Sequence, residues 1–157
     1  MSMPMHLQVV VASTNSQIAG IAASILRGEN DQSICPRISA AHVEAPSNKS
    51  AFYIASNEKK FHIEAATSCY VIDVRRVHLW LALDAKCADK VRTYIMHNGP
   101  TPTGFYRSVF PEPVVSCGFD TPSIPSTKDG LERWISTLVN NLEPWKQRIW
   151  DAFRDSS

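Results

Sequence analysis

The hydrophobic residues of segment 61–83 recur mainly at every second position, which is the period of a β-strand. The apolar row changes phase once, within 73–76, so a bulge or a turn is needed there, and the absence of Gly and Asn favours a bulge. Another apolar run, 52–56, precedes this segment, and the intervening residues 57–60 have the length of a hairpin loop. The pattern predicts an antiparallel sheet of about four to six strands, centred on residues 37–83.

Apolar residues at helical spacing mark three other segments, which are 16–27, 85–97 and 128–154. Residues that favour helix N-termini stand before each of them: Ser13–Ser16, Asp84 and Ser126. Gly28 and Gly99 follow the first two and are suitable helix ends. We expect these helices to cover the apolar face of the sheet, which gives an α+β fold.

The pattern leaves two local questions open within what we expect to be a single domain, 1–157. Residues 7–12 form either a strand before the first helix or the ragged start of that helix. Pro144 interrupts the last helix, which predicts a kink or two helices that meet near Asn141. Residues 99–127 hold many of the prolines, so we expect a Pro-rich loop with short edge strands there.

The composition is that of a globular protein, with 44% hydrophobic and 20% charged residues. The 16 basic and 15 acidic residues nearly balance, which disfavours nucleic-acid binding because phosphate contacts need an excess of Lys and Arg. A modestly basic segment, 59–107, keeps nucleic-acid binding as a third hypothesis. The one apolar candidate for a signal peptide or membrane span, 7–26, has a polar centre, so no membrane association is expected.

The four cysteines, at positions 35, 69, 87 and 117, show no zinc-site spacing. Without a signal peptide they are best interpreted as partly buried thiols in a reducing compartment. We therefore expect a cytoplasmic protein without a cofactor.

Three residues with catalytic or metal-binding side chains share the polar face of the predicted strands: His62, Glu64 and His78. Two imidazoles and a carboxylate can hold zinc in an open site or act as base and orienting group. An antiparallel sheet also needs an ordinary solvated face, and this interpretation is the favoured one. A small metal-assisted hydrolase or nuclease is therefore the alternative function.

Arg76 and Trp80 lie on the same predicted face, and an exposed aromatic beside an arginine is typical of a contact surface. Coverage of Trp80 by the C-terminal helices would instead make it a core residue. Phe105, Tyr106 and Arg107 give the Pro-rich loop an aromatic and cationic character that suits recognition.

The polar turn Ser13–Ser16 is explained by helix capping, because phosphate-binding signatures need glycines and this turn has none. The sequence also contains no nucleophile elbow, Walker loop, dinucleotide fingerprint or zinc-protease motif. The main prediction is a small non-enzymatic protein-binding module of adaptor, chaperone-like or inhibitor type. It would act through the exposed strand face and the aromatic loop, on another protein or on a second copy of itself.

Overall fold

The structure is a computed structural model that describes residues 7–28, 37–43, 66–102, 110–119 and 127–155. Its described strands form one parallel sheet in the order β3-β2-β1-β4-β5. The strands are β1 (Gln8–Ser13), β2 (Arg37–His42), β3 (Thr67–Ser68), β4 (Leu79–Ala82) and β5 (Val114–Ser116). The helices are α1 (Ser16–Arg27), α3 (Ala85–Asn98) and α4 (Lys128–Asp155), with short 3-10 turns η1 (Cys69–Val71) and η2 (Val74–Arg76).

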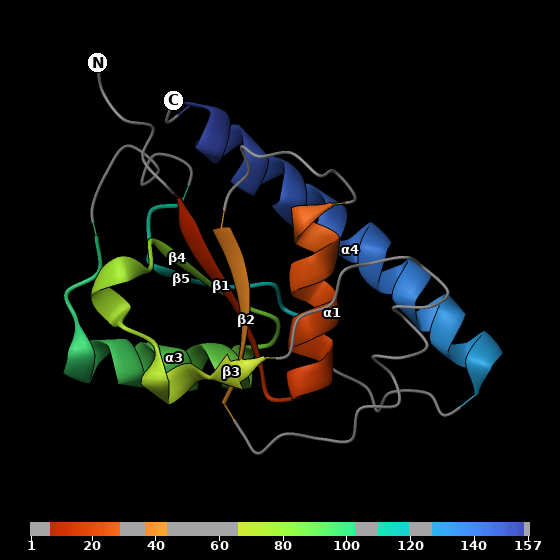
Figure 1. Ribbon diagram of the computed structural model, residues 1–157, viewed down its shortest axis with the longest axis horizontal. Coiled ribbons are helices and arrows are strands. Elements are labelled where there is room, and N and C mark those ends of the chain that lie inside the picture. The colour runs from red at the N-terminus through yellow and green to blue at the C-terminus, as the bar shows by residue number, and fades with distance from the viewer. Residues whose placement is uncertain (1–6, 29–36, 44–65, 103–109, 120–126, 156–157) are drawn as a thin grey trace.

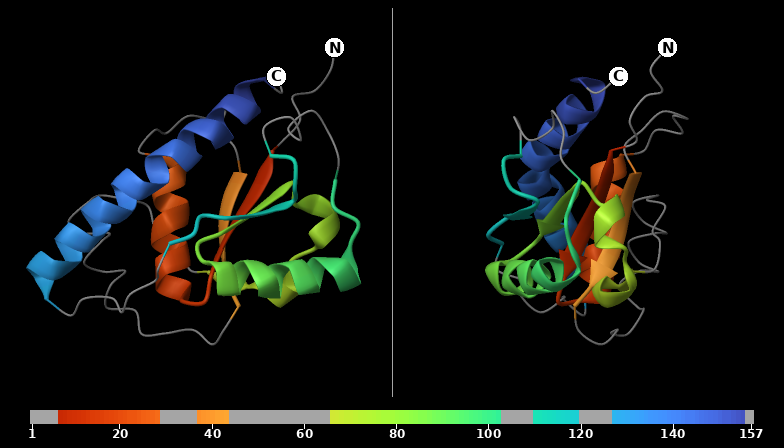
Figure 2. Two further views of the ribbon diagram at one scale, coloured as in Figure 1. Left: turned by 180° about the vertical axis from the view of Figure 1, so that it is seen from behind. Right: turned by 90° about the vertical axis from the view of Figure 1, so that its left-hand side faces the viewer.

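Helices cover both faces of this sheet, which makes a three-layer α/β fold (Figures 1 and 2). One core cluster joins α1 and α4 to alternate strand residues such as Val9, Val11 and Leu81. The other joins α3 and η2 to the residues in between, such as Val10 and Trp80. Each central strand is therefore buried on both sides, as is usual in parallel sheets.

The predicted antiparallel α+β sheet is wrong, because every strand pair among the described residues is parallel. The error came from the assumption of one solvated face. All four residues of β4 are buried, so the alternation there separates two cores and does not separate core from water. The predicted strand 52–56, the hairpin loop 57–60 and the start of segment 61–83 lie outside the described residues.

The phase change within 73–76 is made by a turn and not by the favoured bulge. Asp73 caps η2, because its side chain accepts a hydrogen bond from the backbone N–H of Arg75. The chain thereby reverses its apolar phase between η1 and β4, and segment 61–83 is not one continuous strand.

The three predicted helices are present, and their bounds agree with the predicted ranges to within one residue. At the N-terminus, β1 precedes α1, so residues 7–12 belong to a strand. α4 continues through Pro144 as one helix, and two helices meeting near Asn141 are not observed. Ser126 lies outside the described residues, and it is Thr127 Oγ1 that accepts a hydrogen bond from the Gly130 N–H in the first turn.

No helix within the described residues is both long and apolar enough to cross a membrane. α4 is the longest helix, and charged residues are spread along it. The prediction of a cytoplasmic location itself is not addressed by this observation.

Candidate functional site at the carboxyl edge of the sheet

The side of the sheet on which new strands are added changes between β3 and β4, although all the strands stay parallel. From β1 the chain moves outward to β2 and β3, and it then returns to the opposite side of β1 to form β4 and β5. α1 therefore covers one face and α3 the other, and both helices begin at the carboxyl edge (Figure 1). In open α/β sheets the crevice at such a reversal is the usual ligand site.

The connection from β1 to α1 is a tight polar loop, Ser13–Gln17, held by its own side chains. Ser13 Oγ accepts a hydrogen bond from the Asn15 N–H at 3.1 Å. Asn15 Oδ1 accepts hydrogen bonds from the N–H groups of Gln17 at 2.8 Å and Ile18 at 3.2 Å. These bonds confirm that the turn caps α1, as its sequence predicts.

The loop is nevertheless unusual because most of its polar side chains are buried. Ser13, Ser16 and Gln17 are 0%, 6% and 4% exposed. Hydroxyl and amide groups gathered at the start of a helix can donate hydrogen bonds to an anion, which the helix dipole also favours. The loop is therefore able to bind an oxyanion such as phosphate.

His42 flanks this loop at the end of β2. It pairs in register with Ser13, and the Val43 N–H donates to the Ser13 carbonyl at 3.1 Å. Ile38 and Ala40 of β2 belong to the core under α1, so the alternation places His42 on the same face as that helix. A half-exposed imidazole thus stands beside the first residue of the loop.

Asp84 stands on the other side of the loop, where β4 leads into α3. The Leu83 N–H donates to the Ala12 carbonyl at 3.0 Å, which brings the ends of β4 and β1 together. Asp84 Oδ1 caps α3 by accepting the Cys87 N–H at 2.7 Å. Its second oxygen, Oδ2, is buried and has no hydrogen-bond partner among the described residues.

Two of the described cysteines, Cys69 and Cys117, are held in the thiol form by burial. Burial raises the pKa of the Cys69 thiol to about 11 and that of Cys117 to about 12. Cys87 is fully buried in the first turn of α3. Since the thiolate is the reactive form of cysteine, Cys69 and Cys117 are unreactive at neutral pH.

The residues that the sequence suggested for a metal or catalytic site do not come together here. His62 and Glu64 lie outside the described residues. His78 lies at the amino edge of the sheet, where its Nδ1 accepts a hydrogen bond from the Gln8 N–H at 2.9 Å. No group of three or more His, Cys, Asp or Glu side chains within the described residues is placed to bind a metal ion.

The predicted contact residues are also separated. Trp80 is fully buried between β4 and α3, where its ring packs edge-to-face on Tyr94, so it is a core residue. Arg76 is exposed and forms an ion pair with Asp73 at 3.7 Å. Phe105, Tyr106 and Arg107 lie outside the described residues.

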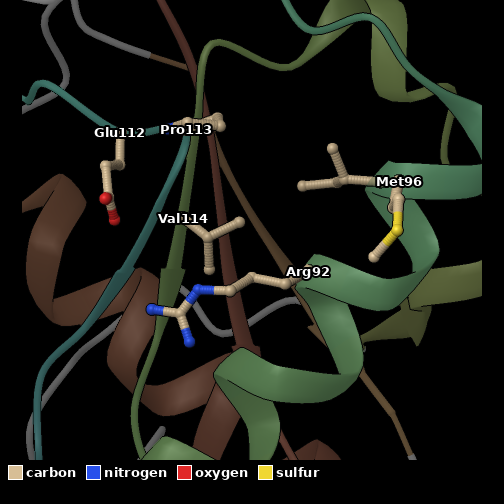
Figure 3. Close-up of a pocket in the computed structure, with 6 residues that line it drawn as sticks. Arg92, Met96, Glu112, Pro113 and Val114 are labelled. Carbon is tan, nitrogen blue, oxygen red and sulfur yellow. The ribbon is translucent and has the colours of Figure 1, made fainter.

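A separate cavity of about 380 Å³ lies between the second half of α3 and the start of β5. Figure 3 shows Arg92 and Met96 reaching from α3 toward the segment that carries Glu112, Pro113 and Val114. The Arg92 guanidinium also pairs with Asp89 at 3.1 Å on the helix surface. No residue of the loop Ser13–Gln17 lines this cavity.

The sequence matches no protein-family model and no curated protein. Several solved structures are nevertheless similar. A mutant of YwlE from Bacillus subtilis is 12% identical, with a TM-score of 0.60 over 90% of this chain and 97% of that one. The tyrosine phosphatase Wzb from Escherichia coli, in complex with sulphate, is 16% identical, with a TM-score of 0.55 over 92% and 99% of the two chains.

Two further structures add to this comparison. A low-molecular-weight phosphotyrosine phosphatase from Vibrio cholerae is 12% identical, with a TM-score of 0.54 over 95% of this chain and 97% of that one. A YwlE arginine phosphatase in which serine replaces a cysteine, and whose active-site serine is phosphorylated, is 12% identical, with a TM-score of 0.60 over 90% and 95%. At these identities the similarity shows the fold, which this chain shares with phosphatases.

These similarities contradict the predicted non-enzymatic protein-binding module, and they contradict the metal-assisted hydrolase as well. The similar structures are phosphatases, which points to an enzyme fold. The residues assigned to the contact surface do not form one surface among the described residues, because Trp80 is buried while Arg76 is exposed. The turn Ser13–Ser16, which begins this loop, was predicted to cap a helix and not to bind phosphate. The available signal was the order of a strand, a polar turn and a helix with small residues, which is how a parallel α/β unit begins.

Proposed function

We propose that this chain acts on a phosphorylated substrate and holds the phosphoryl group at the loop Ser13–Gln17. The observation that carries the proposal is the position of this loop. It lies at the carboxyl edge of the sheet, at the point where the strand order reverses, in a fold shared with phosphatases. The sulphate complex of Wzb and the phosphorylated YwlE variant show that proteins of this fold hold tetrahedral oxyanions.

The described loop supplies neutral donors and no thiol. Hydroxyl groups of Ser13, Thr14 and Ser16 and the amides of Asn15 and Gln17 surround the start of α1. The described Cys69 and Cys117 are protonated at neutral pH because burial raises the pKa of each thiol. Binding of the phosphoryl group is therefore the step that these residues support directly, and a cysteinyl intermediate is not part of the proposal.

The test places a negative charge in the loop by Thr14→Asp. A carboxylate beside the phosphoryl group repels it by about 1–4 kcal/mol, which lowers the affinity by about fivefold to several hundredfold. The same charge lies near the N-terminus of α1, where the helix dipole tolerates or favours it, so folding is preserved. The measurement is an NMR titration with phenyl phosphate, together with phosphate release from p-nitrophenyl phosphate.

Thr93→Asp is the matched control, because Thr93 is exposed on α3 and its hydroxyl contacts only the Asp89 carbonyl of its own helix. We expect unchanged binding in this variant. Equal affinity of the wild type and Thr14→Asp, or ligand-induced shifts that avoid residues 13–17, would remove the proposal.

Two expectations from the sequence continue as proposals. We infer a cytoplasmic location, since Cys69, Cys87 and Cys117 form no disulfide with one another. We also propose that the substrate is presented by another protein or that the chain associates with itself. Light scattering of the purified protein tests the second possibility directly.

A further inference from the structure

The cavity between the second half of α3 and the start of β5 lies away from the loop Ser13–Gln17. α3 begins at the carboxyl edge of the sheet, directly after β4, so its last turns lie near the amino edge, where β5 begins. The volume of about 380 Å³ is within the range of small-molecule sites. The cavity is therefore a second candidate site, and it is independent of the proposed phosphoryl site.

Most of the residues that line this cavity are apolar: Ile95, Met96, Pro113 and Val114. Met96 is 75% exposed, so its side chain is accessible to a ligand. Val114 is held in register with Trp80 of β4, which makes this wall part of the rigid sheet. A flexible methionine facing a fixed wall can adapt to the shape of an apolar group.

Two opposite charges, Arg92 and Glu112, line the same cavity. The Arg92 guanidinium donates to Asp89 Oδ1 through Nη1 at 3.1 Å, and its Nε and Nη2 have no partner among the described residues. Glu112 is exposed and forms no ion pair with a described basic residue. Figure 3 shows Arg92 extending past Val114 toward the side on which the Glu112 carboxylate lies. A cation and an anion are thus both available beside one apolar surface.

We propose that this cavity binds a free amino acid with an apolar side chain, such as leucine. The carboxylate of the ligand accepts hydrogen bonds from the unused nitrogens of Arg92, whose planar fork suits a carboxylate. The ammonium group of the ligand donates to Glu112, and its aliphatic side chain covers Met96 and Val114. A purely anionic ligand is disfavoured because Glu112 and Asp89 repel it, and a purely cationic one because Arg92 does.

The experiment titrates L-leucine into the isotope-labelled protein and follows the backbone amide resonances by NMR. Isocaproic acid lacks the amino group of leucine and isoamylamine lacks its carboxyl group, so each analogue keeps the apolar body and one charge. We expect leucine to shift resonances in segments 92–96 and 112–114. It should bind about threefold to tenfold more tightly than either analogue, which is the range for one hydrogen bond.

Two variants test the two charges separately, and both replaced residues are exposed, so the fold is preserved. Arg92→Met should weaken leucine binding about threefold to tenfold and should not weaken isoamylamine binding. Glu112→Gln should weaken leucine binding by a similar factor and should not weaken isocaproic acid binding. Arg133→Met is the matched control, because Arg133 is exposed on α4 and its Nε donates to the Asp129 carbonyl of its own helix.

The proposal is supported if leucine shifts are confined to the cavity segments and both charge variants bind leucine more weakly than Arg133→Met does. It is overturned if the wild type does not bind leucine, if either analogue binds as tightly as leucine, or if Arg92→Met and Glu112→Gln bind leucine like the wild type. The phenyl phosphate titration is read separately at residues 13–17, so the two proposals can fail independently.

Discussion

Polar residues follow and precede β4, and they differ in whether their buried polar atoms have hydrogen-bond partners. At the amino end, the His78 N–H donates to the Gln8 carbonyl and His78 Nδ1 accepts the Gln8 N–H, both at 2.9 Å. At the carboxyl end, Asp84 Oδ2 is buried without a described partner. A satisfied histidine is part of the scaffold, whereas an unsatisfied buried oxygen at the carboxyl edge, where open α/β sheets usually hold ligands, indicates a candidate site.

This comparison reverses the ranking that residue types alone suggest. Histidine attracts attention because it binds metals and transfers protons near neutral pH. Glutamine and serine attract none, since they are common in loops and helix caps. The hydrogen-bond partners of each group, and the edge of the sheet on which it lies, decide which interpretation holds.

The largest expected effect concerns the middle of β4, which joins the two ends. Trp80→Ala removes a fully buried ring packed on Tyr94 and should lower the free energy of unfolding by about 3–5 kcal/mol, measured by urea denaturation. Trp80→Phe should cost less, because most of the aromatic volume stays and the indole N–H has no described partner to lose. A near-neutral Trp80→Ala variant would mean that the ring is exposed and that β4 has a solvated face.

The next effect compares the two ends directly. Asn15→Ala leaves the N–H groups of Gln17 and Ile18 without their acceptor and should lower the free energy of unfolding by about 1 kcal/mol. His78→Ala removes the acceptor of the Gln8 N–H and should have a similar cost of about 1 kcal/mol. Phenyl phosphate affinity should fall in Asn15→Ala alone, and an equal loss in both variants would show that the two ends do not differ.

The smallest effect concerns the thiols near the carboxyl edge. Burial raises the pKa of Cys69 to about 11 and that of Cys117 to about 12, whereas both thiols have ordinary values near 9.0 in the unfolded chain. The two buried thiols contribute fully to the free energy of unfolding when the pH is below their pKa in the unfolded chain. This contribution is lost as the pH rises toward their higher pKa values in the folded protein. Raising the pH to about 9 should lower the free energy of unfolding by about 0.4 kcal/mol per thiol.

Urea denaturation at neutral pH and at about pH 9 measures this loss. In Cys69→Ala, the drop in the free energy of unfolding between neutral pH and about pH 9 should be smaller by the contribution of the one removed thiol. A pH dependence that is unchanged in this variant would indicate that Cys69 is accessible and ionises normally, which would return it to the candidates for a nucleophile.

Local features of the fold follow closely from the sequence. The helices α1, α3 and α4 have the predicted bounds, and Asn15 and Asp84 cap helices as their residue types indicate. These features depend on neighbours within one or two turns, such as an acceptor side chain two or three residues before an unsatisfied N–H. Period and capping chemistry are therefore sufficient to predict them.

Strand partners and the position of the site do not follow in this way. The row Leu79–Leu83 alternates identically whether the second face meets water or another helix layer. The antiparallel interpretation was therefore wrong, and of the two alternatives left open for Trp80 the buried one holds. The pairing of β1 with β4 joins residues about 70 positions apart, as the Gln8–His78 hydrogen bond illustrates. Such contacts depend on how the layers close around the sheet, and no local pattern encodes them.

By itself, the sequence determined where helices begin and end and that the turn Ser13–Ser16 caps one of them, because these outcomes are settled within a few residues. Only the tertiary structure decided that the strands are parallel, that Trp80 is core and that Ser13 and Asp84 follow neighbouring strands at the same edge of the sheet. The physical reason is that burial and unsatisfied hydrogen bonds are properties of packed neighbours, and in this chain those neighbours come from segments far apart in the sequence.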